Sequence, residues 1–204
     1  MYQVSGFIKE VDVKKDLEKV KNELFNRFGI EELHILKQVH GDKIFIDSGG
    51  EGDGVIVTKP KSGALIRTAD CFGVALIDRV KGISGVFHSG WRGTELNICG
   101  KGAGLMKTMG CFDIEATIFP GIESCCFEIG LELLPRFEKA NIAVKERDNG
   151  YYGDLKKAIS ESLKGEGIEN IKDLSECTFC NEEYFSFRRD KTEKRHGVFV
   201  VNCS

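Results

Sequence analysis

The sequence of 204 residues lacks any apolar run long enough to span a membrane, and Met1 to Lys15 lack the apolar core of a signal peptide. It also lacks a basic excess, because the formal net charge is -3, and this argues against a dedicated nucleic-acid surface. From these absences we expect a cytoplasmic protein that binds neither a membrane nor a nucleic acid. Its eight cysteines are then expected to be reduced thiols, either buried or bound to metal.

Proline is scarce as well, with three residues, and no repeat or polar linker interrupts the chain. Hydrophobic residues make up 41% of the sequence, which is enough for a sizeable core. We therefore predict a single compact domain over residues 1–204.

Hydrophobic spacing predicts more strands than helices. One helix is predicted between Asp12 as its cap and Gly29 as its end, a second from Thr94 towards Met109, and a third over 154–163 with Asp154 as its cap. Strand-sized apolar runs occur at 2–8, 33–39, 43–46, 55–57, 64–66, 73–77, 83–87, 116–119 and 197–201. The strands come in clusters, so the predicted class is α+β, with mixed β-sheets and flanking helices.

Histidine is rare, with four residues, and two of these lie where a predicted strand ends. His40 follows one strand, His88 precedes a glycine-rich turn, and Cys71 lies at a strand junction between them. Two imidazoles and one thiolate suit zinc, and three protein ligands leave one position for water or substrate. The alternative is a strand-end histidine, a buried cysteine and a core histidine, because this long-range spacing is not a specific motif.

Two polar residues beside these positions are candidates for catalysis. Asp70 could orient a ligand histidine or act as acid or base, although a turn or capping aspartate is an equally good interpretation. Arg92 is expected at the N-terminus of the predicted helix, where it would help to bind an anion such as phosphate; the alternative is a surface ion pair.

Cys177 and Cys180 form a CxxC pair whose role the sequence leaves open. One pair cannot complete a four-ligand zinc site without partners, and nothing around it resembles a thioredoxin context. Cys125 and Cys126 are adjacent in the chain and are not expected to bridge each other.

Four segments occur in the order, and at about the spacing, of one known family: QVHG at 38–41, TADC at 68–71, HSGWRG at 88–93, and 177–189. The chain resembles the purine nucleoside phosphorylase family formerly labelled multicopper polyphenol oxidase, laccase-like. The resemblance implies that zinc is bound by His40, Cys71 and His88. It also implies phosphorolysis of adenosine, inosine, guanosine and methylthioadenosine, with adenosine deamination as a further activity. Purine nucleosides and phosphate are the small-molecule partners it implies.

Substrate contacts are expected from Gln38, which would alternate with His40 on one strand face and hydrogen-bond a purine edge, and from Arg188. A buried strand with solvated arginines is the alternative interpretation of the region around Arg188. The chain departs from the family pattern in several places, including Gly73 where proline is usual, and this leaves the preferred nucleoside open.

Two other activities compete with this interpretation. In a cysteine hydrolase, Cys71 would be the nucleophile and His88 its base, and such a pair does not need His40. A multi-copper oxidase centre needs many more histidines than four.

Overall fold

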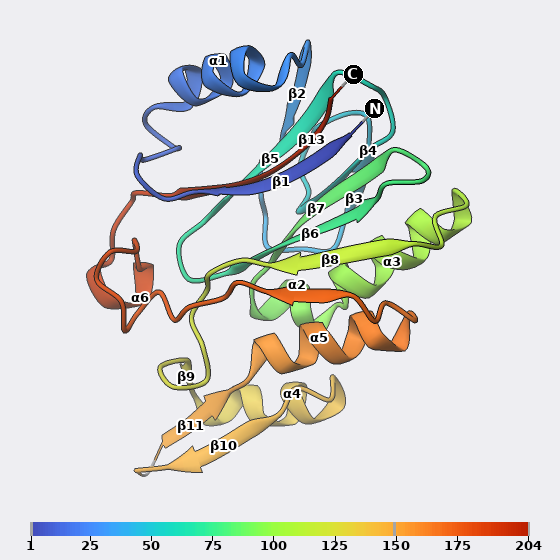
Figure 1. Ribbon diagram of the computed structural model, residues 1–204. Coiled ribbons are helices and arrows are strands. Elements are labelled where there is room, and N and C mark those ends of the chain that lie inside the picture. The colour runs from blue at the N-terminus through green and yellow to red at the C-terminus, as the bar shows by residue number, and fades with distance from the viewer. Residues whose placement is uncertain (1, 149, 204) are drawn as a thin grey trace.

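Two stacked β-sheets form the larger part of the molecule in the computed structural model, which describes residues 2–148 and 150–203 (Figure 1). The four-stranded sheet has the order β1-β13-β5-β2, and the six-stranded sheet has the order β12-β8-β6-β7-β4-β3. The strands of the first sheet are β1 (Gln3–Ile8), β2 (Glu32–Ile35), β5 (Ser62–Thr68) and β13 (His196–Asn202). The strands of the second are β3 (Ile44–Ile46), β4 (Gly54–Val57), β6 (Phe72–Asp78), β7 (Ile83–Ser89), β8 (Ile114–Ile118) and β12 (Ile171–Asp173).

Side chains alternate between two buried faces along the central strands, which explains why these strands are apolar throughout. In β5, Ala64 and Ile66 belong to the core between the two sheets, whereas Leu65 belongs to the core on the other side. In β4, Val55 lies between the sheets and Ile56 faces away from that core. Each sheet therefore needs a further layer on its outer face.

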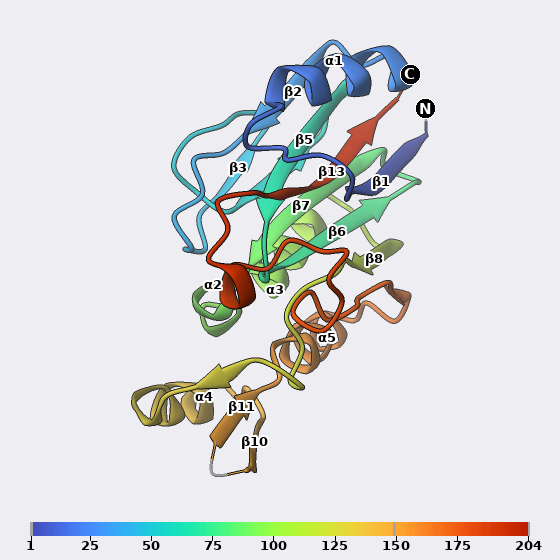
Figure 2. The same cartoon turned by 90° about the vertical axis from the view of Figure 1, so that its left-hand side faces the viewer.

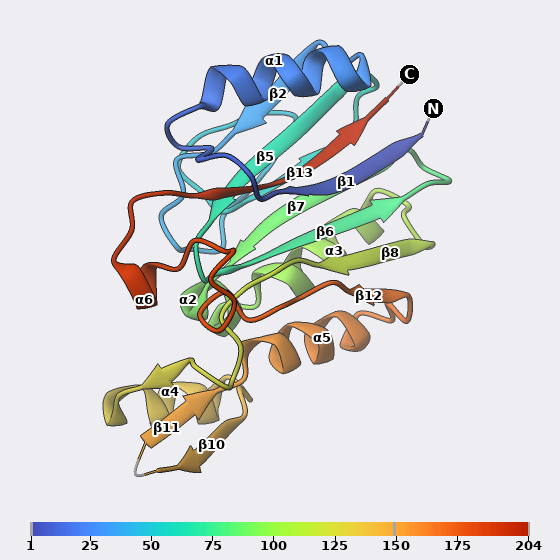
Figure 3. The same ribbon diagram turned by 60° about the vertical axis from the view of Figure 1, so that its left-hand side comes forward.

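Helices supply these outer layers. The helix α1 (Leu17–Phe28) covers the four-stranded sheet with its buried residues Val20 and Leu24. On the opposite side, α3 (Ile98–Thr108) and α5 (Leu155–Gly165) cover the six-stranded sheet (Figure 3). The result is a helix–sheet–sheet–helix sandwich, so the predicted α+β class with mixed sheets and flanking helices is confirmed.

A smaller lobe extends from one end of this sandwich (Figure 2). Its three-stranded sheet has the order β10-β11-β9 and its helical part is short. Its elements are β9 (Glu128–Ile129), a 3-10 turn (Leu131–Leu133), α4 (Leu134–Lys139), β10 (Val144–Arg147) and β11 (Gly150–Gly153). Phe127 and Phe137 are buried and belong to the same core cluster as the buried residues of α5, which joins the lobe to the sandwich. None of these elements was predicted from the sequence, because they are short and largely exposed.

Three predicted boundaries were wrong. The first helix begins at Leu17 rather than beside Asp12, whose carboxylate instead accepts a hydrogen bond from the backbone N–H of Arg195. The helix predicted from Thr94 is split into α2 (Trp91–Glu95) and α3, because Asn97 adopts a left-handed conformation and caps α3. The strand predicted over 33–39 ends at Ile35. By contrast, Asp154 caps α5 as predicted, since its side chain accepts a hydrogen bond from the backbone N–H of Lys157.

None of the helices within 2–148 and 150–203 combines the length and apolar character that crossing a membrane requires.

The buried ring of His196 gives the fold a predictable response to acid. His196 is fully buried at the start of β13, and its Nε2 accepts a hydrogen bond from the backbone N–H of Phe185 at 2.7 Å. Burial lowers the pKa of His196 from 6.5 to about 4. Above pH 6.5 both folded and unfolded states hold a neutral ring, so the stability is complete there. Below pH 6.5, the His196 ring is protonated in the unfolded state, whereas in the folded state it stays neutral down to about pH 4.

We therefore expect the free energy of unfolding to fall by up to roughly 1.4 kcal/mol per pH unit between pH 6.5 and about 4 because of this one group. The measurement is urea denaturation across this range for the wild type and His196→Gln. The variant should be less stable at neutral pH, but its free energy of unfolding should change less steeply with pH. Identical slopes would contradict the assignment.

Candidate active site

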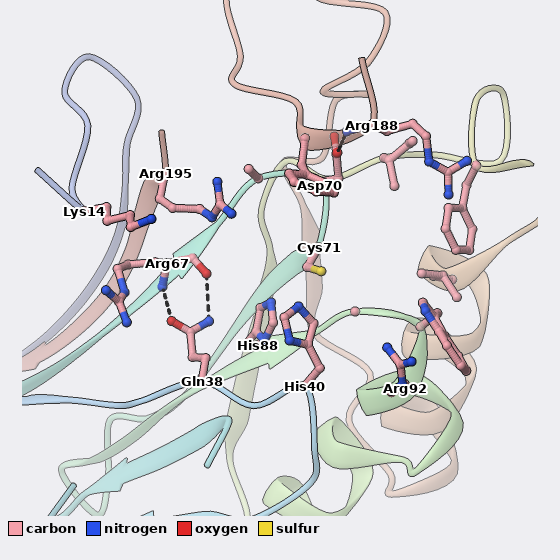
Figure 4. Close-up of a pocket in the computed structure, with 17 residues that line it drawn as sticks. Lys14, Gln38, His40, Arg67, Asp70, Cys71, His88, Arg92, Arg188 and Arg195 are labelled. Atoms are coloured by element: carbon pink, nitrogen blue, oxygen red, sulfur yellow. Dashed lines mark hydrogen bonds between the residues drawn. The ribbon is translucent and has the colours of Figure 1, made fainter. Parts of the chain in front are cut away.

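A cavity of about 460 Å³ opens where several strands of the two sheets end (Figure 4). This volume lies in the usual range for sites that bind small molecules. The wall combines aromatic and aliphatic side chains with charged ones. It is lined by Lys14, Gln38, His40, Arg67, Ala69, Asp70, Cys71, His88, Gly90, Trp91, Arg92, Ile122, Phe127, Leu155, Phe187, Arg188 and Arg195.

Strand register explains why Cys71 and His88 meet in this cavity. The strands β6 and β7 are antiparallel, with Phe72 opposite Ser89 and Gly73 opposite His88. The start of β6 therefore lies beside the end of β7, and Cys71, one residue before β6, reaches the same edge as His88. Gly90 leaves room for this approach, because a Cβ atom at this position would lie 2.6 Å from the sulfur of Cys71.

His40 completes the group from the segment that follows β2. Each of His40, Cys71 and His88 offers one ligand atom, and these atoms lie within 4.8 Å of one another. The ring centroids of the two histidines are 4.9 Å apart. His88 is buried, Cys71 is half-buried and His40 is exposed to the cavity, so the group forms part of the cavity wall (Figure 4). The structure thus brings together the three residues that the sequence analysis proposed as metal ligands.

A buried carboxylate, which the sequence analysis missed, holds both histidines. Asp53 is fully buried, and its Oδ1 lies 2.8 Å from Nδ1 of His88. The same carboxylate accepts backbone hydrogen bonds from Val39 (3.1 Å), His40 (3.0 Å) and Gly41 (2.7 Å). These bonds fix the left-handed conformation of His40, whose φ is 60°. Asp53 stands between two glycines at the start of the buried strand β4, which is the one signal that the sequence offered.

The charges of this group depend on one another. Burial alone would raise the pKa of the Cys71 thiol, but His88 and His40 outweigh burial and lower it to about 6. Burial would lower the pKa of His88, but the Cys71 thiolate and the hydrogen bond to Asp53 outweigh burial and raise it to about 9. Burial also opposes the charge of Asp53, yet hydrogen bonds from His88 and Gly41 lower its pKa. The site therefore favours a thiolate at neutral pH.

These residues fit a single zinc ion. Asp53 occupies Nδ1 of His88, which leaves Nε2 as its ligand atom, and carboxylate–histidine pairs of this kind commonly support bound zinc. Zinc bonds of about 2.0–2.3 Å place neighbouring ligand atoms roughly 3.5 Å apart, and the three atoms here lie within 4.8 Å of one another, which is compatible with this value. Three ligands leave a fourth position open towards the cavity, as in catalytic zinc sites.

Asp70 faces the cavity from the turn between β5 and β6, with a positive φ of 87°. Its Oδ1 accepts a hydrogen bond from the Thr178 hydroxyl at 2.8 Å, and its Oδ2 accepts one from the backbone N–H of Arg188 at 2.6 Å. Thr178 is buried and was not predicted to matter. Asp70 does not hold a histidine of the group, because Asp53 occupies that position.

The buried strand that was the alternative interpretation of the region around Arg188 is absent, and the region carries the short helix α6 (Phe187–Asp190). Arg188 lines the cavity, with its guanidinium 5.3 Å from the Phe127 ring centroid and donating to the backbone oxygen of Glu128. Arg189 points into the protein, where it donates to the backbone oxygens of Thr178, Phe179 and Tyr184. Only the first of the two arginines is therefore available to a ligand in the cavity.

Gln38 lines the cavity, but it does not lie on a strand face with His40, because β2 has already ended. Its amide pairs with the backbone of Arg67, donating to the oxygen at 2.7 Å and accepting from the nitrogen at 2.9 Å (Figure 4). This pair ties the His40 segment to β5. Gln38 thus has a positioning role in the fold, and its contact with a purine remains a prediction.

Arg92 lies at the cavity on the five-residue helix α2, with its guanidinium 4.3 Å from the Trp91 ring centroid. The predicted long helix behind it does not exist, so the arginine side chain itself is the feature suited to an anion. Lys14, Arg67 and Arg195 line the cavity on the other side of the histidines in the view of Figure 4. These three residues were not predicted from the sequence, because they come from distant parts of the chain.

Comparison with known proteins extends the interpretation. Residues 7–202 match the family model described as multi-copper polyphenol oxidoreductase laccase. The chain is 36% identical to a purine nucleoside phosphorylase of Aquifex aeolicus, over 87% of this chain and 86% of that protein. It is 35% identical to one of Clostridium acetobutylicum, over 97% of this chain and 88% of that protein.

Solved structures share the fold. The structure of YlmD from Geobacillus stearothermophilus superposes with a TM-score of 0.85 at 23% identity, covering 99% of this chain and 92% of that one. The structure of the Bacillus licheniformis protein YfiH superposes with a TM-score of 0.82 at 22% identity, covering 95% of this chain and 85% of that one.

Asp53 offers a test of how the site is held. Replacing Asp53 by alanine leaves three backbone N–H groups and the His88 ring without their acceptor, so we expect a loss of about 3–5 kcal/mol of stability. Asp42→Ala is the matched control, because this nearby carboxylate makes only a surface ion pair with Lys101 and should cost less than about 1 kcal/mol. Urea denaturation measures both variants. Equal losses would show that Asp53 does not hold the two segments.

Proposed function

This chain belongs to the multi-copper polyphenol oxidoreductase laccase family, and on this premise we propose that it is a zinc-dependent enzyme that cleaves purine nucleosides with phosphate. The proposed substrates are adenosine, inosine, guanosine and methylthioadenosine, with adenosine deamination as a further activity. The proposed unit is one zinc-dependent purine nucleoside phosphorylase-like domain over the whole chain. The relatives named purine nucleoside phosphorylase support the reaction class, and the chemistry of the cavity supports the details.

One observation carries the proposal: a set of two histidines and a cysteine lies in a cavity whose wall is both aromatic and basic. Trp91 and Phe127 give the wall aromatic surface against which a purine can pack. The basic side chains suit a substrate or co-substrate of negative charge. A nucleoside together with phosphate has both features.

His40, Cys71 and His88 would hold the zinc ion. When bound, zinc would supply Lewis-acid chemistry at an oxygen of the substrate or of phosphate. A multi-copper centre does not fit this cavity, because only two histidines line it among the residues that the structure describes.

The reaction replaces one bond at the ribose with another. The bond between ribose C1′ and the purine nitrogen breaks, the purine leaves with the electron pair and takes up a proton, and a phosphate oxygen bonds to C1′. Positive charge develops on the ribose in the transition state, so an anion held beside it is stabilising. We assign phosphate binding to Arg92 and a contact with the substrate to Arg188, which flank the cavity near the aromatic wall.

Asp70 is the acidic side chain among the cavity residues described, and we assign proton transfer to it. Its two hydrogen bonds, from Thr178 and from the backbone of Arg188, fix the orientation of the carboxylate. Gln38 would contact the purine only through the hydrogen-bonding capacity that its pairing with Arg67 leaves free.

A cysteine hydrolase is the second candidate, and a specific observation favours it. Cys71, His88 and Asp53 form a thiol–imidazole–carboxylate series, in which the carboxylate binds Nδ1 and the thiol pKa is lowered. Such a series can activate a cysteine nucleophile without any metal. His40 separates the two candidates, because the metal site needs it and the triad does not.

Removing ligands tests the zinc proposal. We expect His40→Ala and Cys71→Ser each to lose about one zinc ion per chain relative to the wild type and to lower turnover more than about 100-fold. Elemental analysis and a nucleoside assay measure the two effects. If His40→Ala keeps its activity while a substrate-like electrophile alkylates Cys71, the cysteine hydrolase proposal replaces this one.

The products of the reaction test phosphorolysis. We expect ribose 1-phosphate to form from adenosine, inosine and methylthioadenosine only when phosphate is present. Free ribose without a need for phosphate would indicate a hydrolase, and inosine from adenosine without bond cleavage would leave only deamination.

Arg92 tests where phosphate binds. Losing one charge-assisted contact should raise the phosphate KM of Arg92→Ala by about 10- to 100-fold without changing its zinc content. Arg136→Ala is the matched control, because Arg136 also lies over the Trp91 ring, at 4.8 Å, but is bound to Glu95 and does not line the cavity. Equal effects in both variants would assign the change to Trp91 rather than to phosphate.

A further inference from the structure

Four cysteines meet outside the cavity, from two segments far apart in the chain. Cys125 and Cys126 lie between β8 and β9, and Cys177 and Cys180 lie between β12 and α6. The four sulfur atoms lie within 4.8 Å of one another. The sulfur of Cys180 is 3.6 Å from that of Cys125 and 3.2 Å from that of Cys126. The partners that the CxxC pair lacked in the sequence are therefore present in the fold.

The backbone explains how these segments come together. Gly121 and Cys177 form a parallel β-bridge, and the N–H of Thr178 donates to the oxygen of Gly121 at 3.1 Å. The N–H of Gly121 donates in turn to the oxygen of Glu176. Figure 3 shows the chain after β8 beside the chain after β12. The bridge fixes the two segments close to where the four thiols meet.

The spacing of the sulfurs suits one metal ion rather than a cluster. Zinc–sulfur bonds of about 2.3 Å place the four sulfurs of a tetrahedral site about 3.8 Å apart. The distances of 3.6 and 3.2 Å, and the limit of 4.8 Å for all pairs, lie near this value. In a four-iron cluster each cysteine binds a different iron, so the sulfurs must be farther apart.

We propose that Cys125, Cys126, Cys177 and Cys180 bind one zinc ion in a closed site of four thiolates, separate from the group around His40. Four protein ligands leave no position for substrate, so the site is structural. Its exposed members, Cys125 and Cys180, give the ion a path from solvent.

Groups around the cysteines suit the net negative charge of zinc with four thiolates. The Arg147 guanidinium donates hydrogen bonds to the backbone oxygens of Ser124 (2.8 Å) and Cys125. Backbone groups of Glu123, Phe179 and Cys180 form hydrogen bonds with the Cys177 sulfur. Backbone N–H groups directed at a sulfur are a supporting shell of the kind that bound metals use.

The zinc ion would cross-link the wall of the cavity from behind. The segment before Cys125 carries Ile122, which lines the cavity and donates its N–H to the backbone oxygen of Asp70 at 2.7 Å. The segment after Cys177 carries Thr178, whose hydroxyl binds the Asp70 carboxylate. Both segments that carry the cysteines therefore hold Asp70. The zinc ion would be a positioning element for this residue.

The full chain, purified under reducing conditions and reconstituted with zinc, tests the site by metal content. We expect His40→Ala to keep one zinc ion per chain. The double variant, which carries both His40→Ala and Cys180→Ser, should lose that ion. Cys180→His in the His40→Ala background should keep it, because three cysteines and one histidine are also an ordinary zinc set. Cys111→Ala is the control, since this buried cysteine belongs to neither group and its loss should leave the metal content unchanged.

Cobalt gives a second measurement that does not depend on activity. Cobalt bound to His40→Ala should show thiolate-to-metal absorption about four times that of a one-thiolate site, because four Co–S bonds contribute. A folded His40→Ala protein that stays free of metal would overturn the proposal. Acid-labile sulfide in the protein would also overturn it, because it would indicate an iron–sulfur cluster. So would a mass lower by two hydrogens in the reduced preparation, because it would indicate a disulfide among these cysteines. None of these results depends on the nucleoside reaction, so the two proposals can fail separately.

Discussion

The Asp53 carboxylate is the contact on which the geometry of the cavity depends. A fully buried carboxylate is costly unless hydrogen bonds satisfy it, and here three backbone N–H groups and the His88 ring do so. Because Asp53 directly precedes β4 and β4 pairs with β7, the same contact links the His40 segment to the sheet that carries His88. The position of His40 is thus set by the core, although His40 itself is exposed.

Asp70 connects the group of His40, Cys71 and His88 with the group of four cysteines. It precedes Cys71, and its backbone oxygen and carboxylate bind Ile122 and Thr178, which stand beside the four cysteines. One group has three candidate ligands and lines the cavity, whereas the other has four and lies outside it. An open set suits chemistry and a closed set suits stability. The two proposed sites would therefore have separate roles, one in the cavity wall and one behind it.

The sequence predicted the sheets well and the lobe poorly, for physical reasons. The central strands are buried on both faces, so they appear as apolar runs that strand propensity alone identifies. The strands β9, β10 and β11 and the helix α4 are too short and too exposed to show a hydrophobic period. Asn97 breaks the long predicted helix through a left-handed conformation that propensity does not indicate.

The candidate site was predictable only in part. Sequence motifs predicted His40, Cys71 and His88, which the structure brings together, but the contacts of Asp53 and Thr178 join distant segments of the chain. The partners of the CxxC pair depend in the same way on the bridge between Gly121 and Cys177. Residue types and short spacing carry no information about such pairings.

The net charge of the chain does not indicate the charge of its cavity. The chain is acidic as a whole, with a formal charge of -3, whereas the cavity is basic. The cavity wall holds one carboxylate against five basic side chains, namely Lys14, Arg67, Arg92, Arg188 and Arg195. Opposite charges elsewhere on the surface pair with one another, as Lys101 and Asp42 do, and add little to the field in the cavity. Cavity walls of low dielectric constant strengthen the attraction of the basic side chains for an anion. The distribution of charge, rather than the net charge of the chain, therefore indicates the kind of ligand. A small anion bound among apolar and aromatic side chains is the chemistry that this arrangement favours.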